Sequence, residues 1–90
     1  MEIKLLEQAR LDLAYWKQTG NKAIMKKITA LLQDIVEHPY TGIGKPEALK
    51  YELAGKWSRR ITSEHRLIYS VHEEQIVVYV FSMRYPYGRI

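Results

Sequence analysis

The sequence predicts an α+β fold in which two N-terminal helices pack on one face of a small antiparallel sheet. Apolar residues recur at helical spacing between residues 9 and 35, and apolar and polar residues alternate from residue 51 onward. A loop rich in glycine and proline, residues 39–47, separates the two halves. Helices followed by a run of strands are typical of a helical layer on one face of an antiparallel sheet.

The helices are predicted from two apolar stripes. The first stripe consists of Ala9, Leu13 and Trp16, and the second of Ile24, Ile28, Leu31 and Ile35. The first helix should end near Gly20, Asn21 should cap the second, and Pro39 should lie beyond the end of the second.

Four segments with strand-like patterning follow, at residues 51–55, 57–63, 65–72 and 76–85, and residues 1–6 predict a short strand before the first helix. Residues 73–75 should turn the chain between the last two strands. The last strand is apolar on both faces, as expected of a central strand.

Strand alternation assigns the arginines to faces. Arg60 is out of phase with Trp57 and Ile61, and Arg66 is out of phase with Leu67 and Tyr69, so both should project from the face away from the helices. Arg59 shares the parity of Trp57, and for it a structural and a catalytic role both remain open. Paired guanidinium groups on an open face suit phosphate, because each planar fork matches two phosphate oxygens.

Length and composition bound the class of protein. Ninety residues suffice for one domain, predicted over residues 1–90, and 47% hydrophobic residues indicate a globular chain. The absence of cysteine excludes disulfides and thiolate metal sites. The polar N-terminus is not typical of a signal peptide, and no apolar run approaches the roughly 18 residues of a membrane span. We therefore expect a cytoplasmic location and no membrane partner.

The charge is uneven along the chain. The formal net charge is +4, and residues 41–90 carry eight Lys/Arg against five Asp/Glu. A basic C-terminal half favours a polyanionic partner, while an ordinary charged surface is the alternative that charge alone leaves open. Lys45, Glu47 and Lys50 lie close to the predicted loop, where a carboxylate flanked by cations suits a base acting on a polyanion.

The run from Gly44 to Tyr69, "GKPEALKYELAGKWSRRITSEHRLIY", resembles the Txe/YoeB family of bacterial toxins within the RelE/ParE superfamily. The resemblance covers nearly the whole chain. It implies a ribosome-dependent mRNA endonuclease that cuts in the A site by attack of a ribose 2′-OH on the adjacent phosphate, with neither metal nor other cofactor. It also implies a YefM/Axe-like antitoxin, the 70S ribosome and mRNA as partners, and a homodimer.

The resemblance also implies roles for individual residues. Glu47 falls on the general base and Arg66 on the phosphate-stabilising arginine. Lys50 and Arg60 fall on positions that contact the mRNA backbone, and Lys45 joins this substrate-binding set. Near the C-terminus, Arg84, Tyr85 and Tyr87 match the family pattern. His65 matches a family position that we interpret as structural.

The match breaks at Pro86, which stands where the family has the histidine that protonates the 5′-oxygen leaving group. Tyr87 or Tyr85 could supply that proton, since a phenol with a pKa of about 10 is protonated at neutral pH. Otherwise the chain is a slow or detoxified enzyme, or a homologue that binds the ribosome or an antitoxin without cutting. Glu47 argues against a third class, the DNA-topology poisons of the ParE branch.

Overall fold

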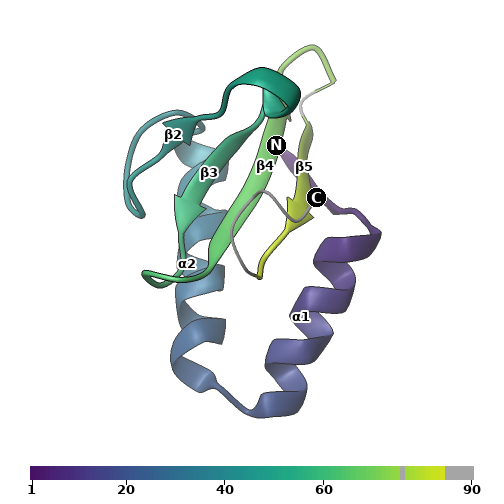
Figure 1. Ribbon diagram of the computed structural model, residues 1–90. Helices are drawn as coiled ribbons and strands as arrows, with labels where there is room; N and C mark the ends of the chain where they lie inside the picture. The colour runs from purple at the N-terminus through teal and green to yellow at the C-terminus, as the bar shows by residue number, and fades with distance from the viewer. Residues whose placement is uncertain (76, 85–90) are drawn as a thin grey trace.

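The computed structural model describes residues 1–75 and 77–84, and the chain is traced in Figure 1. The N-terminal half forms β1 (Glu2–Leu5), α1 (Glu7–Thr19) and α2 (Lys22–Glu37). The second half forms β2 (Glu47–Ala48), the 3₁₀ helix η1 (Tyr51–Leu53), β3 (Trp57–Arg60), β4 (Arg66–His72) and β5 (Val77–Ser82). The predicted α+β class is confirmed.

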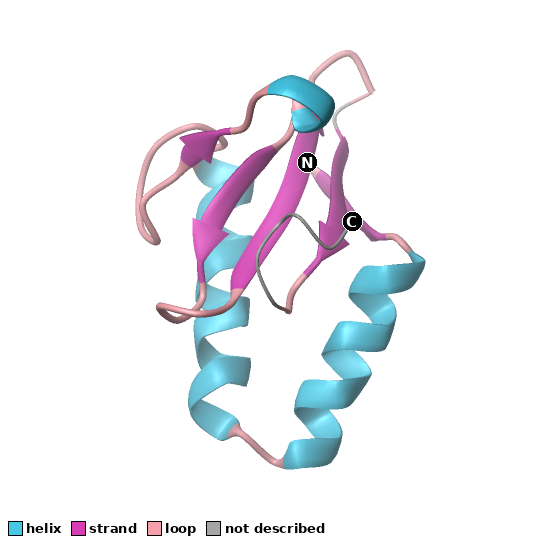
Figure 2. Ribbon diagram, in the orientation of Figure 1, coloured by secondary structure: helices cyan, strands magenta, loops and turns pink. Residues whose placement is uncertain are grey.

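The two helices begin and end where the sequence predicts. α1 stops at Gly20, whose φ of 70° is the left-handed conformation that glycine adopts readily. The side chain of Asn21 caps α2 by accepting a hydrogen bond of 3.1 Å from the main-chain N–H of Ile24. In Figure 2 the helices form a hairpin whose connection lies at the bottom of the view, and α2 runs behind the sheet.

One hydrophobic core joins the helices to the sheet. The predicted stripe of α2 is buried throughout, and α1 contributes Ala9 and Trp16. The sheet contributes residues of alternate positions, as a half-covered sheet should. These are Leu67, Tyr69, Val78 and Val80. β3, β4 and β5 therefore turn one face toward the helices. The alternate residues of these strands, among them Arg60 and Arg66, belong to the other face.

The sheet has the order β1-β5-β4-β3-β2, and all its pairs are antiparallel except one. β1 pairs in parallel with β5, with Glu2 opposite Val77. The predicted antiparallel meander is thus extended by a parallel edge strand. β5 lies between β1 and β4, which agrees with its apolar character on both faces.

The predicted strand over residues 51–55 is wrong. Tyr51 has a φ of 58°, which a strand cannot accommodate, and residues 51–53 form η1 instead. The short strand of this region lies earlier, at Glu47–Ala48, which the sequence assigned to the loop or left unassigned. Glu47 pairs with Ser58 of β3, so the chain brings this carboxylate into the sheet.

Candidate functional site

The pairing register of β2, β3 and β4 places three charged side chains on the face away from the helices. Arg60 lies directly opposite Arg66, and Glu47 lies opposite Ser58, two residues before Arg60 on the same face of β3. Glu47 and Arg60 are exposed and Arg66 is half-buried. The prediction that Arg60 and Arg66 project together from the open face is confirmed, and Glu47 shares that face.

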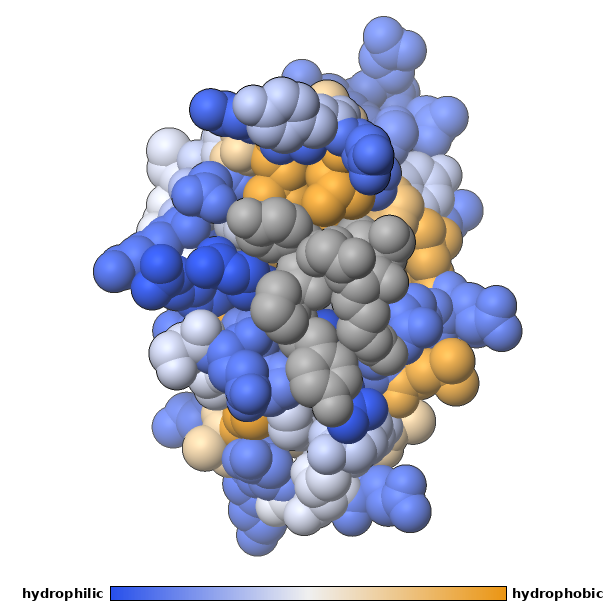
Figure 3. All heavy atoms as spheres, in the orientation of Figure 1, coloured by the Kyte–Doolittle hydropathy of each residue, from blue (hydrophilic) through white to orange (hydrophobic). Residues whose placement is uncertain are grey.

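The arginine pair lies at facing positions of two neighbouring strands. Residues directly opposite each other in an antiparallel pair have Cβ atoms about 4.5–5.5 Å apart, so two long side chains there can reach one ligand. A phosphate suits such a pair, because each planar guanidinium fork matches two phosphate oxygens. Figure 3 shows strongly hydrophilic side chains gathered beside the lower end of β3 on this face. The arrangement is therefore suited to binding a polyanion.

Arg59 belongs to the opposite face and has a structural role. Its side chain is fully buried, and all five of its N–H donors are bonded. The acceptors are the Asp34 carboxylate, the Tyr69 hydroxyl and the main-chain carbonyls of His38, Thr41 and Ile43. The question that the sequence left open for Arg59 is thereby answered, because no donor remains for a substrate.

This buried arginine fixes the loop that leads to the site. Gly42 and Gly44 adopt φ values of 115° and 78°, and a Cβ on Gly42 would lie 1.9 Å from Oδ2 of Asp34. The carbonyl of Gly44 accepts a hydrogen bond of 2.7 Å from the main-chain N–H of Arg60. The loop is thus joined both to the buried ion pair and to β3, one residue before Lys45 and three before Glu47.

The pKa values of Asp34 and of the neighbouring Tyr69 are both shifted. The hydrogen bond from Arg59 holds the pKa of Asp34 below its ordinary value of 3.8, and the N–H of Ile43 acts in the same direction. Burial raises the pKa of Tyr69 above 10, although its hydrogen bond from Arg59 opposes that rise. Tyr69 donates in turn to the carbonyl of Pro39, at 2.6 Å. Asp34 is thus ionised and Tyr69 neutral at neutral pH.

A pocket of about 460 Å³ opens beside the carboxylate. It is lined by the five consecutive residues Glu47, Ala48, Leu49, Lys50 and Tyr51. Lys50 is exposed, precedes η1 and lines the same pocket as Glu47. Lys45 is exposed and, with a φ of 52°, begins the turn into β2. The predicted substrate-binding lysines therefore flank the predicted base in the chain.

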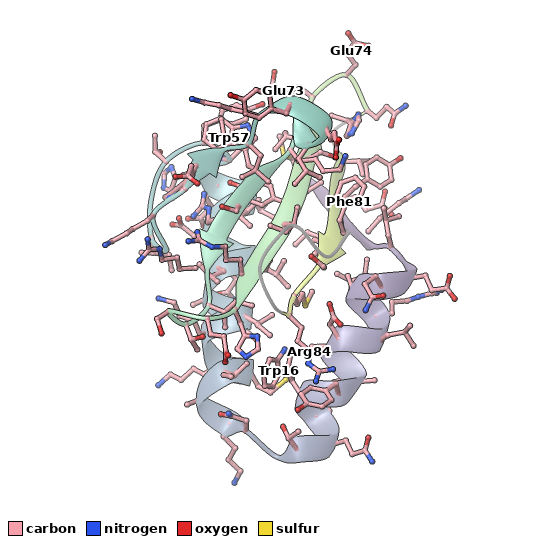
Figure 4. All side chains as sticks on the ribbon, viewed as in Figure 1. Trp16, Trp57, Glu73, Glu74, Phe81 and Arg84 are labelled. Atoms are coloured by element: carbon pink, nitrogen blue, oxygen red, sulfur yellow. The ribbon has the colours of Figure 1, made fainter. Side chains whose placement is uncertain are left out.

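The end of β5 is held by α1. The N–H of Met83 donates to Oδ2 of Asp12, and its carbonyl accepts from Nε1 of Trp16, both at 2.9 Å. The guanidinium carbon of Arg84 lies 3.4 Å from the centre of the Tyr15 ring. Figure 4 shows Arg84 and Trp16 near each other between β5 and α1. Arg84 thus stacks on α1, whereas we predicted a substrate contact for it.

His65 contacts Trp16 edge-on, with ring centres 4.9 Å apart, which agrees with its interpretation as structural. The sequence reading missed the anchoring residues Asp12 and Tyr15. The sequence could have indicated Asp12, because an acidic residue on the buried side of α1 requires a hydrogen-bond partner.

Tyr85, Pro86 and Tyr87 lie outside the described residues. Within residues 1–75 and 77–84, no three His, Asp or Glu side chains are grouped to hold a metal ion. No helix among these residues is long and apolar enough to cross a membrane.

The fold of two helices on one face of a sheet is shared with small bacterial toxins of known structure. A solved YoeB/ParE toxin from Agrobacterium tumefaciens superposes with a TM-score of 0.92 at 36% identity, over 97% of this chain and 100% of that one. YoeB from Staphylococcus aureus in complex with YefM superposes with a TM-score of 0.85 at 42% identity, over 97% and 98%. The same toxin solved as a dimer gives 0.86 at 41% identity, over the same shares.

The curated sequences agree with the solved structures. Toxin YoeB from Escherichia coli K12 is 44% identical over 87 residues, which is 97% of this chain and 100% of the relative. Residues 6–87 match the model of the YoeB-like toxins of bacterial type II toxin–antitoxin systems. The chain belongs to that family.

Proposed function

We propose that this toxin is a ribosome-dependent endoribonuclease that cuts mRNA in the A site on the open face of the sheet. The observation that carries the proposal is the register that places Glu47, Arg60 and Arg66 on one face. A carboxylate beside paired guanidinium groups supplies a proton acceptor and a phosphate site together. The carboxylate of Glu47 argues against a DNA-topology poison.

The reaction uses the ribose 2′-OH as nucleophile. Glu47 takes the 2′-OH proton while the 2′-oxygen bonds to phosphorus, and the bond from phosphorus to the 5′-oxygen breaks. The products are a 2′,3′-cyclic phosphate and a 5′-hydroxyl. Arg66 stabilises the charge that builds on the phosphoryl oxygens, where one preorganised donor is typically worth about 2.7–4 kcal/mol. Arg60, Lys45 and Lys50 bind the neighbouring backbone. No step calls on a metal or other cofactor.

We propose that protonation of the leaving group limits the rate at which this toxin cleaves mRNA. Pro86 has no proton to give, so the 5′-oxygen must take its proton from Tyr87, Tyr85 or water. General acid catalysis typically contributes about 10²–10⁴ in rate. We therefore propose an attenuated enzyme, with Tyr87 as the favoured acid and Tyr85 as a substrate contact.

The partners follow from the family and from the S. aureus relative, which is solved with YefM and as a dimer. We propose a YefM/Axe-like antitoxin and a homodimer for this chain. Its substrate is mRNA on the 70S ribosome, which places its action in the cytoplasm.

Pro86 also favours a second candidate, a homologue that occupies the ribosome or binds an antitoxin without cutting. Primer extension on a translated message with purified toxin and 70S ribosomes separates the two. Truncated products at A-site positions support the endonuclease. Bound toxin with a message that stays full-length supports the second candidate.

A further inference from the structure

Tyr51 presents its ring to solvent at the edge of the candidate site. It is 92% exposed, whereas the next most exposed large hydrophobic residue in the described chain, Leu11, is 59% exposed. A tyrosine usually turns its ring toward apolar neighbours and leaves only its hydroxyl in water. Here the whole side chain is displayed.

The main chain of Tyr51 is also strained. Its φ of 58° is rare for a bulky residue, so this conformation costs free energy. The turn itself is held by main-chain hydrogen bonds, from Leu53 N–H to Lys50 carbonyl and from Ala54 N–H to Tyr51 carbonyl. The Tyr51 side chain makes no hydrogen bond or ring contact with other described residues. Asparagine would meet the same backbone demand more easily, so folding alone does not favour tyrosine here.

The ring stands where a ligand of the site would meet it. Tyr51 lines the same pocket of about 460 Å³ as Glu47, with Lys50 between them in the chain. A nucleotide at Glu47 would offer a phosphate to the cations and a flat base to the exposed ring. Stacking of a base on an aromatic side chain is typically worth about 1–3 kcal/mol and tolerates any base.

We propose that Tyr51 is a binding residue on which a base of the message stacks next to the scissile phosphate. This inference rests on the proposed function, because it takes RNA as the ligand of the site. Tyr51 holds the nucleotide by stacking on its base, while Arg60 and Arg66 bind its phosphate. The strained turn of η1 keeps the ring clear of the protein and open to the base.

The test measures toxin affinity for 70S ribosomes carrying a message that is 2′-O-methylated at the A site, so that 2′-OH attack is blocked. Tyr51→Phe keeps the ring and should bind like wild type. Tyr51→Leu keeps the bulk without the aromatic face and should weaken binding roughly 5- to 150-fold. Leu11→Ala, which trims another exposed apolar residue, should leave binding unchanged.

A message with one abasic ribose identifies the stacked base. When that base is missing, wild type and Tyr51→Leu should bind equally. The fold provides a second readout, since Tyr51→Asn should melt no lower than wild type. Equal affinities of wild type and Tyr51→Leu, a loss unchanged at every abasic position, or a clearly destabilised Tyr51→Asn would each overturn the stacking role. If wild-type toxin does not bind the ribosome at all, the proposed function itself fails.

Discussion

Arg60 and Arg66 lie directly opposite each other on β3 and β4, on the sheet face that the helices leave open. Two guanidinium groups at facing positions of neighbouring strands suit one phosphate, because each planar fork matches two phosphate oxygens. The neighbouring Arg59 belongs to the opposite face, and its five donors are all bonded to protein acceptors.

The exposed position of Arg60 predicts a loss of binding without a loss of fold. Arg60→Thr should weaken binding to 70S ribosomes and change stability little, because surface substitutions usually stay within about 0.5 kcal/mol. If Arg60 contacts one phosphate, the slope of log affinity against log salt should fall by about 0.7–0.9. Arg10→Gln, at an exposed position on α1, is the matched control. An unchanged salt slope for Arg60→Thr would remove Arg60 from the RNA-binding face.

The bonds of Arg59 predict a large loss of stability. Arg59→Met leaves the Asp34 carboxylate and three carbonyl groups without the donors that Arg59 supplies, and each buried polar group left unsatisfied typically costs about 1–3 kcal/mol. Chemical denaturation measures this loss. Arg60→Met, at the next residue but on the open face, should cost far less. Similar losses in both variants would show that burial of Arg59 does not decide its role.

The lowered pKa of Asp34 predicts an acid-sensitive fold. Because the pKa is lower in the folded state than in the unfolded state, the unfolded chain binds more protons in acid. The stabilisation is present above about pH 4 and is lost as the pH falls through the folded-state pKa. Asp34→Asn should be less stable at neutral pH and should lose less stability on acidification. Parallel curves of unfolding free energy against pH for both proteins would contradict this assignment.

The sequence predicted the helices and the faces of the arginines because both follow from local periodicity. Ile24 to Ile35 repeat at helical spacing, and Arg60 and Arg66 are out of phase with their apolar neighbours. The parallel pairing of β1 with β5 was not predictable, since it joins the two ends of the chain. The contact between Arg59 and Asp34 spans 25 positions, and the turn at Tyr51 depends on a backbone conformation that tyrosine rarely adopts.

The proline at position 86 leads us to expect that a substitution there can raise the rate of mRNA cleavage. Pro86→His should restore a proton donor for the 5′-oxygen and raise single-turnover cleavage on the ribosome about 10²-fold or more, with little change in affinity. Tyr87→Phe in the Pro86 protein should be severe if the phenol acts as the acid. Equal rates for wild type, Pro86→His and Tyr87→Phe would leave no general acid at this end of the chain.

The central claim is that Glu47 drives 2′-OH attack on the open face, and single-turnover cleavage of a ribosome-bound message tests it most directly. Wild type and Glu47→Gln are compared on two messages that differ only by one 2′-deoxy nucleotide at the A site. We expect wild type to cut the ribose message and not the deoxy message. Glu47→Gln should bind equally well and cut about 10²–10⁴ more slowly. Equal rates for the two proteins, or cleavage of the deoxy message, would contradict the account.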